Sequence, residues 1–192
     1  MQQMETYPNF KPIVIVSDAF MATSATAIRA GLEAFGLRTS LFLCGLETHV
    51  WDVLAGKLPD CDDIIFDCHG EEGQLLFEVA SRDTAGFQPV RIGPAEVRAR
   101  AQLSHKFVIS LACTTGTPAL AEAFLAGGCR GFMGPHGCPH VHVGFLFVLQ
   151  FYRHLLQHIG SGEGNSHLAA REALEAARHF DVDAAMFTIY ET

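Results

Sequence analysis

A histidine and a cysteine in this sequence each follow an apolar run and come just before a glycine-containing stretch. His69 stands in 66-FDCHGEEG-73 and Cys113 stands in 107-FVISLACTTG-116. The apolar runs predict buried strands, and each reactive side chain comes where its strand ends. A thiolate is a strong nucleophile, and a neighbouring imidazole can take its proton. The pair therefore indicates a nucleophile and its base, with the N–H groups of Gly70 and Cys113 as candidates for an oxyanion hole.

Apolar strands alternate with amphipathic helices along most of the chain. The pattern predicts strands over 13–17, 39–44, 64–68, 107–113 and 130–134, and helices over 24–35, 47–56, 94–103, 118–126, 143–158 and 166–179. Two further runs, 74–80 and 87–93, predict a hairpin, and 185–191 predicts an edge strand or a docked tail. This order is typical of an α/β fold with a mostly parallel sheet and helices on both faces.

Helix boundaries are indicated at two places. Thr23 or Ser24 is a candidate cap for the first helix. Thr117 followed by Pro118 predicts a capped start for the helix over 118–126, because proline is favoured at the first helical position.

The carboxyl ends of the predicted parallel strands gather the polar candidates. Strand ends of this kind meet at one edge of an open α/β sheet, where ligands bind. His69 and Cys113 belong to this edge, as do Asp18 and the loop 134-GPHGCPHVHVG-144. We therefore expect His69 and Cys113 to lie together, and His136 to line a substrate cleft beside them.

Composition limits the classes of function. The 192 residues are 49% hydrophobic, which predicts a single globular domain over 1–192. The net charge of −8 argues against binding to nucleic acid or to an anionic membrane surface. The first residues lack the pattern of a signal peptide, so we expect a cytoplasmic protein with its six cysteines reduced.

The loop over 136–142 permits a different interpretation. It carries His136, Cys138, His140 and His142 at a spacing of two, and imidazole and thiolate groups suit zinc. The spacing matches no familiar zinc pattern, and Pro139 interrupts it. A metal-binding protein therefore stays an alternative, while the main interpretation includes no metal and no cofactor.

Several segments resemble one protein family. The stretch 69-HGEEG-73 after an apolar strand is similar to the histidine loop of caspases, and 107-FVISLACTTG-116 resembles the strand and A-C-x-T-G turn of CHAT domains. CHAT domains are relatives of caspases and separases among the caspase-like cysteine peptidases. The resemblance continues through 121–134, 150–157 and 168–177, and so covers roughly residues 60 to 180.

The resemblance implies a caspase-like three-layer α/β/α sandwich. It implies that His69 is the general base or acid, and that Cys113 attacks a peptide carbonyl to form a thioester. Acidic pockets in related peptidases accept Arg or Lys, so the resemblance implies that Asp18 binds a basic side chain of the substrate. The expected partners are a polypeptide substrate and a separate regulatory or sensor protein. A catalytically idle scaffold with the same fold is the other alternative.

Overall fold

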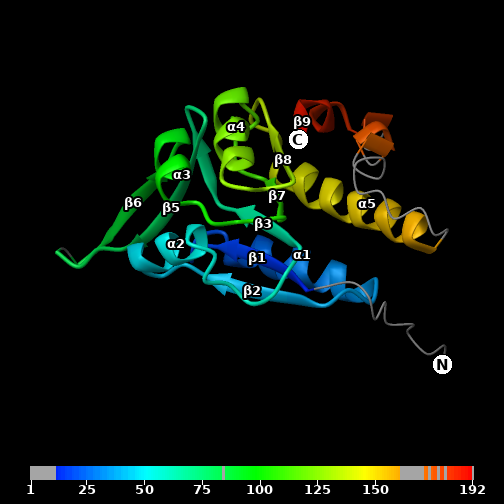
Figure 1. Ribbon diagram of the computed structural model, residues 1–192. Coiled ribbons are helices and arrows are strands. Elements are labelled where there is room, and N and C mark those ends of the chain that lie inside the picture. The colour runs from blue at the N-terminus through cyan, green and yellow to red at the C-terminus, as the bar shows by residue number, and fades with distance from the viewer. Residues whose placement is uncertain are drawn as a thin grey trace.

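The computed structural model describes residues 12–83, 85–160, 171, 172, 174–176, 178, 179 and 181–191. A six-stranded sheet runs through the molecule in the order β2-β1-β3-β7-β8-β9 (Figure 1). The first five of these strands are parallel, and β9 pairs antiparallel with β8 at one edge. The strands of this sheet are β1 (Ile13–Ser17), β2 (Thr39–Leu43), β3 (Asp63–Asp67), β7 (Phe107–Ser110), β8 (Gly131–Pro135) and β9 (Phe187–Glu191).

Helices cover both faces of this sheet, as Figure 1 shows. The helices are α1 (Ala22–Ala34), α2 (Glu47–Leu54), α3 (Pro94–Arg100), α4 (Pro118–Ala126) and α5 (Val141–Gly160), with a 3-10 turn, η1 (Val182–Met186), before β9. Among the described residues, no helix is both long enough and apolar enough to cross a membrane.

Alternation along the strands divides the core into two apolar clusters. Val14, Val16 and Phe66 pack on the face covered by α2, α3 and α4. Ile13 and Ile15, one residue out of phase, pack on the face covered by α1 and α5. Successive side chains of a strand point to opposite faces, so strands buried on both sides are apolar at almost every position.

A small antiparallel sheet carries the histidine. Its strands, β4 (His69–Glu71), β5 (Gln74–Ala80) and β6 (Phe87–Ile92), form a meander in that order. Only Cys68 separates β4 from β3. Leu75 and Phe77 of β5 are fully buried in the cluster beneath α2, α3 and α4. The loop with His69 is thereby fixed to the core on both sides.

The helix over 118–126 begins as predicted, and the first helix does not. The Thr117 side chain accepts a hydrogen bond from Leu120 N at 3.3 Å, with Pro118 at the first helical position. The first helix begins at Ala22 without a side-chain cap, and Asp18 Oδ1 instead accepts hydrogen bonds from the N–H groups of Phe20 and Met21, at 3.0 Å each.

The strand that carries the cysteine is shorter than predicted. The strand predicted over 107–113 ends at Ser110, so the cysteine lies on a turn beyond it. Half of the helix predicted over 166–179 lies outside the described residues, and the described positions between 171 and 179 are helical. Of the two alternatives for 185–191, the edge strand is confirmed, with a 3-10 turn before it.

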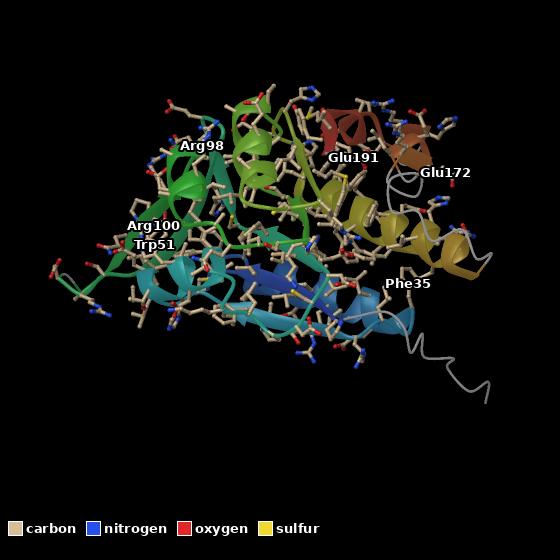
Figure 2. All side chains as sticks on the ribbon, viewed as in Figure 1. Phe35, Trp51, Arg98, Arg100, Glu172 and Glu191 are labelled. Carbon is tan, nitrogen blue, oxygen red and sulfur yellow. The ribbon has the colours of Figure 1, made fainter. Side chains whose placement is uncertain are left out.

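Polar contacts anchor the fold away from the cysteine. At the amino end of β3, the buried Asp63 carboxylate pairs with Arg130 and accepts a hydrogen bond from the Tyr152 hydroxyl at 3.0 Å. On the outer side of α2 and α3, the Arg100 guanidinium lies 4.4 Å from the centre of the Trp51 ring (Figure 2). These contacts stabilise the scaffold and do not reach the carboxyl ends of the strands.

Candidate active site

The carboxyl ends of the strands frame a cleft that contains both predicted catalytic side chains. The cleft encloses about 520 Å³, including space that is open to solvent. The residues that line it are Met21, Ser24, Asp67, Cys68, His69, Leu111, Cys113, Pro139, His140, Val141 and Gly144. His69 is exposed and Cys113 is half-buried, so a ligand in the cleft can reach both.

Close backbone packing holds the histidine loop against the cysteine. A Cβ atom placed on Gly70 would lie 2.1 Å from the carbonyl oxygen of Cys113 and 2.6 Å from its nitrogen. No side chain fits into that gap, so glycine is required next to His69. Three residues after Gly70, the N–H of Gly73 donates a hydrogen bond to Thr114 Oγ1 at 3.4 Å. The sequence prediction that His69 and Cys113 meet at one edge of the sheet matches this packing.

Hydrogen bonds fix the turn that presents Cys113. The Thr115 hydroxyl lies 2.7 Å from Ser110 Oγ and also contacts the carbonyl of Ala112 at 2.7 Å. Thr114 has a φ of 60°, a left-handed conformation that a β-branched residue rarely adopts. Its N–H donates to the carbonyl of Gly137 at 2.8 Å, which helps to hold this conformation. Strained residues of this kind cluster at active sites.

The Cys113 thiol is neutral at rest. Burial raises its pKa from an ordinary value near 9 to about 11, and the neighbouring Cys138 thiol adds to the increase through a hydrogen bond. The fraction of thiolate at pH 7 is therefore about one in 10⁴. A base or a change in surroundings must remove the proton before this sulfur can attack a carbonyl.

An acidic residue that the sequence prediction did not include lies in the cleft. Asp67 is only 3% exposed, and its Oδ2 has no hydrogen-bond partner within the described part of the chain. Burial raises its pKa to about 6, against the effect of a hydrogen bond with Ser24. The sequence carries a signal for this residue, because Asp67 precedes His69 by two residues at the end of the same predicted strand.

Asp18, the expected reader of a basic residue, is not available to a substrate. Its exposed fraction is 0%, and it does not line the cleft. Besides the two N–H groups at the start of α1, its carboxylate accepts a hydrogen bond from Glu78 N at 2.9 Å. An aspartate that follows a strand and joins three backbone N–H groups organises the turn rather than a pocket.

His136, expected to line the cleft, also lies elsewhere. Its side chain is exposed, its N–H donates to the carbonyl of Met186 at 2.8 Å, and it is absent from the cleft lining. Pro139 and His140, later in the same loop, line the cleft instead. The bend imposed by proline ends the extended alternation that would have placed these side chains on one side.

The histidines and the cysteine of this loop do not gather at one point. In residues 136–142, which are all described, no three His, Cys, Asp or Glu side chains come together to hold an ion. His140 stacks on His142 with ring centres 5.6 Å apart, and His142 Nε2 lies 3.5 Å from Asp181 Oδ2. The described residues therefore give no support to the interpretation as a metal-binding protein through this loop.

Comparison with known proteins supports the fold. No family model matches the sequence, and no curated protein matches it. Among solved structures, the chain is similar to one in the crystal structure of the Saccharomyces cerevisiae separase–securin complex at 3.0 Å, with a TM-score of 0.53 and 12% identity. The match covers 100% of this chain and 12% of the yeast chain. At this identity the likeness concerns the fold alone, and it confirms the predicted caspase-like α/β/α sandwich.

Proposed function

We propose that this protein is a cysteine endopeptidase of the caspase-like clan, with His69 and Cys113 as its catalytic dyad. The observation that carries the proposal is the packing of Gly70 on the backbone of Cys113. This packing holds the His69 loop against the cysteine, and the side chains of His69 and Cys113 line one cleft. Such packing is unnecessary for two unrelated surface residues, and it supports the proposal because a base must lie near the nucleophile that it activates.

In the proposed reaction, His69 accepts the proton of Cys113, and the sulfur attacks the carbonyl carbon of the scissile bond. The N–H groups of Gly70 and Cys113 then stabilise the oxyanion of the tetrahedral intermediate. Protonated His69 gives its proton to the leaving amine, and a thioester remains on Cys113. Water, deprotonated by His69, hydrolyses the thioester and restores the thiol.

Asp67 supplies the substrate preference in this proposal. Its carboxylate is buried in the cleft, and one oxygen has no hydrogen-bond partner among the residues that the structure describes. A buried carboxylate of this kind is stabilised by a cation that bonds to it. The guanidinium of arginine or the ammonium of lysine fits that requirement. We therefore propose cleavage next to a basic residue, with Asp67 in the role first expected for Asp18.

Quenched fluorescent peptides test the proposal. The full chain is assayed with peptides that carry arginine or the uncharged norleucine at one position. We expect cleavage of the arginine peptide, a fall of at least about 1000-fold in kcat/KM for Cys113→Ala, and a similar loss for His69→Ala. His154→Ala is the matched control, because His154 lies on α5 about 15 Å beyond Gly144 of the cleft.

Asp67→Asn tests the substrate preference separately. We expect its kcat/KM to fall by about 100-fold for the arginine peptide and by less than about threefold for the norleucine peptide, because breaking a buried ion pair costs several kcal/mol. Equal losses for both peptides would show that Asp67 supports the fold or the dyad and does not bind the substrate side chain.

A catalytically idle scaffold is the second candidate, and one observation favours it. A Cys113 pKa of about 11 leaves little thiolate at neutral pH. A peptidyl ketone electrophile with a basic side chain distinguishes the two candidates. Covalent labelling of Cys113 in the wild type but not in His69→Ala supports the peptidase, and no labelling together with no cleavage supports the scaffold.

A regulatory partner belongs to the proposal as well. Burial and the hydrogen bond with Cys138 both raise the pKa of Cys113, so a protein that binds beside the cleft and displaces Cys138 would ease the transfer of its proton to His69. Adding a partner should then raise the rate of Cys113 alkylation, which is measurable without a peptide substrate.

A further inference from the structure

A second cysteine lies beside the proposed nucleophile. Gly116 N donates to the carbonyl of Pro135 at 2.7 Å, and Thr114 N donates to the carbonyl of Gly137 at 2.8 Å. Moving two residues back along one segment moves two residues forward along the other, so the segments run antiparallel. The next residues in this register are Cys113 and Cys138.

The side chains of this pair meet. The Cys113 and Cys138 thiols share a hydrogen bond, and both are unoxidised. Two thiols that share a hydrogen bond have their sulfur atoms in contact, so a small adjustment of the two side chains brings them to the distance of a disulfide bond. Cys138 is exposed and Cys113 is half-buried, whereas the other cysteines, Cys44, Cys61, Cys68 and Cys129, are buried.

We propose that Cys113 and Cys138 form a reversible disulfide when the protein meets a hydroperoxide, and that this pair is a modification site of the cleft. The exposed Cys138 sulfur, as a thiolate, attacks one oxygen of hydrogen peroxide. The O–O bond breaks, and a sulfenic acid forms on Cys138 as hydroxide leaves and is protonated to water.

Cys113 completes the reaction. Its thiol loses a proton and attacks the Cys138 sulfur, so that the S–S bond forms, the S–O bond breaks, and a second water leaves. The two thiols lose two electrons and two protons in all, and one peroxide becomes two waters. A dithiol reductant returns both cysteines to thiols by exchange.

Exposure assigns a different role to each of the two cysteines. Oxidants reach the exposed sulfur of Cys138 first, because susceptibility follows exposure and thiolate character. Cys113 reacts poorly with peroxide by itself, since its raised pKa keeps it protonated. Its place is therefore that of the resolving thiol, which protects both sulfurs from irreversible oxidation.

The consequence for catalysis rests on the proposed function, but the disulfide does not. A Cys113 sulfur joined to Cys138 cannot attack a carbonyl. The pair would thus inactivate a peptidase under oxidation and restore it on reduction, while in an idle scaffold the same bond would form without a change in activity.

Peptide mapping tests the disulfide directly. The reduced full chain is treated with hydrogen peroxide, remaining thiols are alkylated, and the protein is digested with trypsin. The sequence places Cys113 in peptide 107–130 together with Cys129, and Cys138 in peptide 131–153. We expect a cross-linked pair of these peptides that disappears after treatment with dithiothreitol.

Variants identify the sulfur atoms. The cross-link should be absent from Cys113→Ser and Cys138→Ser and should persist in Cys129→Ser, with circular dichroism confirming that each variant is folded. A cross-link that persists in Cys113→Ser, or oxidation of Cys138 to sulfinic acid with no cross-link, would overturn the proposal.

Peptidase activity, measured on the same samples, separates this proposal from the previous one. A loss of at least about tenfold on oxidation, reversed by dithiothreitol, supports both. A cross-link in a protein that is inactive even when reduced supports the disulfide and overturns the peptidase. Reversible peroxide inactivation with no cross-link supports the peptidase and overturns the disulfide.

Discussion

The burial of Asp67 predicts an unusual dependence of stability on pH. Its side chain is 3% exposed, and burial raises its pKa to about 6 in the folded protein. The pKa of an aspartate in the unfolded chain is about 3.9. The folded state therefore binds this proton more tightly, so the ionised carboxylate destabilises the native protein above pH 6 and has no such effect below pH 4.

Replacing Asp67 with asparagine keeps the shape of the side chain and removes its charge. A difference of about 2 pH units between the folded and unfolded pKa corresponds to about 3 kcal/mol. We expect the free energy of unfolding of Asp67→Asn, relative to wild type, to be higher at pH 7.5 than at pH 4 by about this amount. New contacts of the amide affect both pH values alike and cancel in the comparison.

Urea unfolding at the two pH values measures this difference. The chain has one tryptophan, Trp51, whose fluorescence reports unfolding, and circular dichroism checks that the transition is cooperative. Asp52→Asn is the matched control: its side chain is 42% exposed and pairs with Lys57, so its removal should change stability by less than about 1 kcal/mol at either pH.

One result would refute the reasoning about Asp67. If the gain from Asp67→Asn differs between the two pH values by less than about 1 kcal/mol, the carboxylate is solvated in the folded protein. The argument for a cation-binding pocket would then fail with it. If the expected gain appears while the arginine peptide is cleaved more slowly, stability and substrate binding are in conflict at this residue, as is common in active sites.

Three further predictions follow from packing and hydrogen bonds. Gly70→Ala should lower the free energy of unfolding in urea by about 1–3 kcal/mol and abolish cleavage, because its Cβ would lie 2.1 Å from the Cys113 carbonyl oxygen. Gly45→Ala is the control and should match wild type, because no atom lies within 4 Å of the new Cβ. Unchanged cleavage by Gly70→Ala would contradict the dyad. Cys138→Ala should lower the pKa of Cys113 below about 11, while burial, the largest cause of the increase, keeps it above its ordinary value. The rate of iodoacetamide alkylation of Cys113 at pH 7, measured by mass spectrometry, should rise by about three- to tenfold, and an unchanged rate would show that burial alone sets the pKa. Tyr152→Phe should lower the free energy of unfolding in urea by about 1–3 kcal/mol, because the buried Asp63 carboxylate loses the 3.0 Å hydrogen bond from the Tyr152 hydroxyl. Cleavage should be unchanged, and a loss of activity in a folded variant would contradict the separation of this network from the cleft.

The sequence was sufficient for the scaffold because its signals are local. Strands such as 13-IVIVS-17 are apolar at every position but the last, and burial on both faces accounts for that composition in a folded chain. Thr117 and Pro118 define the start of α4 through contacts within a few residues. Local capping failed at α1, because the groups that hold its start include Asp18, which also bonds to Glu78, 60 residues away.

The sequence by itself determined that His69 and Cys113 come together, since both follow strands of one parallel sheet and such strands end at one edge. Only the tertiary structure decided which carboxylate faces the cleft. Asp18 and Asp67 both stand at the carboxyl ends of apolar strands, and their roles differ. Backbone N–H groups, one of them from the distant Glu78, bond to Asp18, while one oxygen of Asp67 has no partner in the described part of the chain and lies in the cleft. The contact of Cys113 with Cys138 was likewise invisible in the sequence, because it depends on how the segment after β8 folds back along the nucleophile turn.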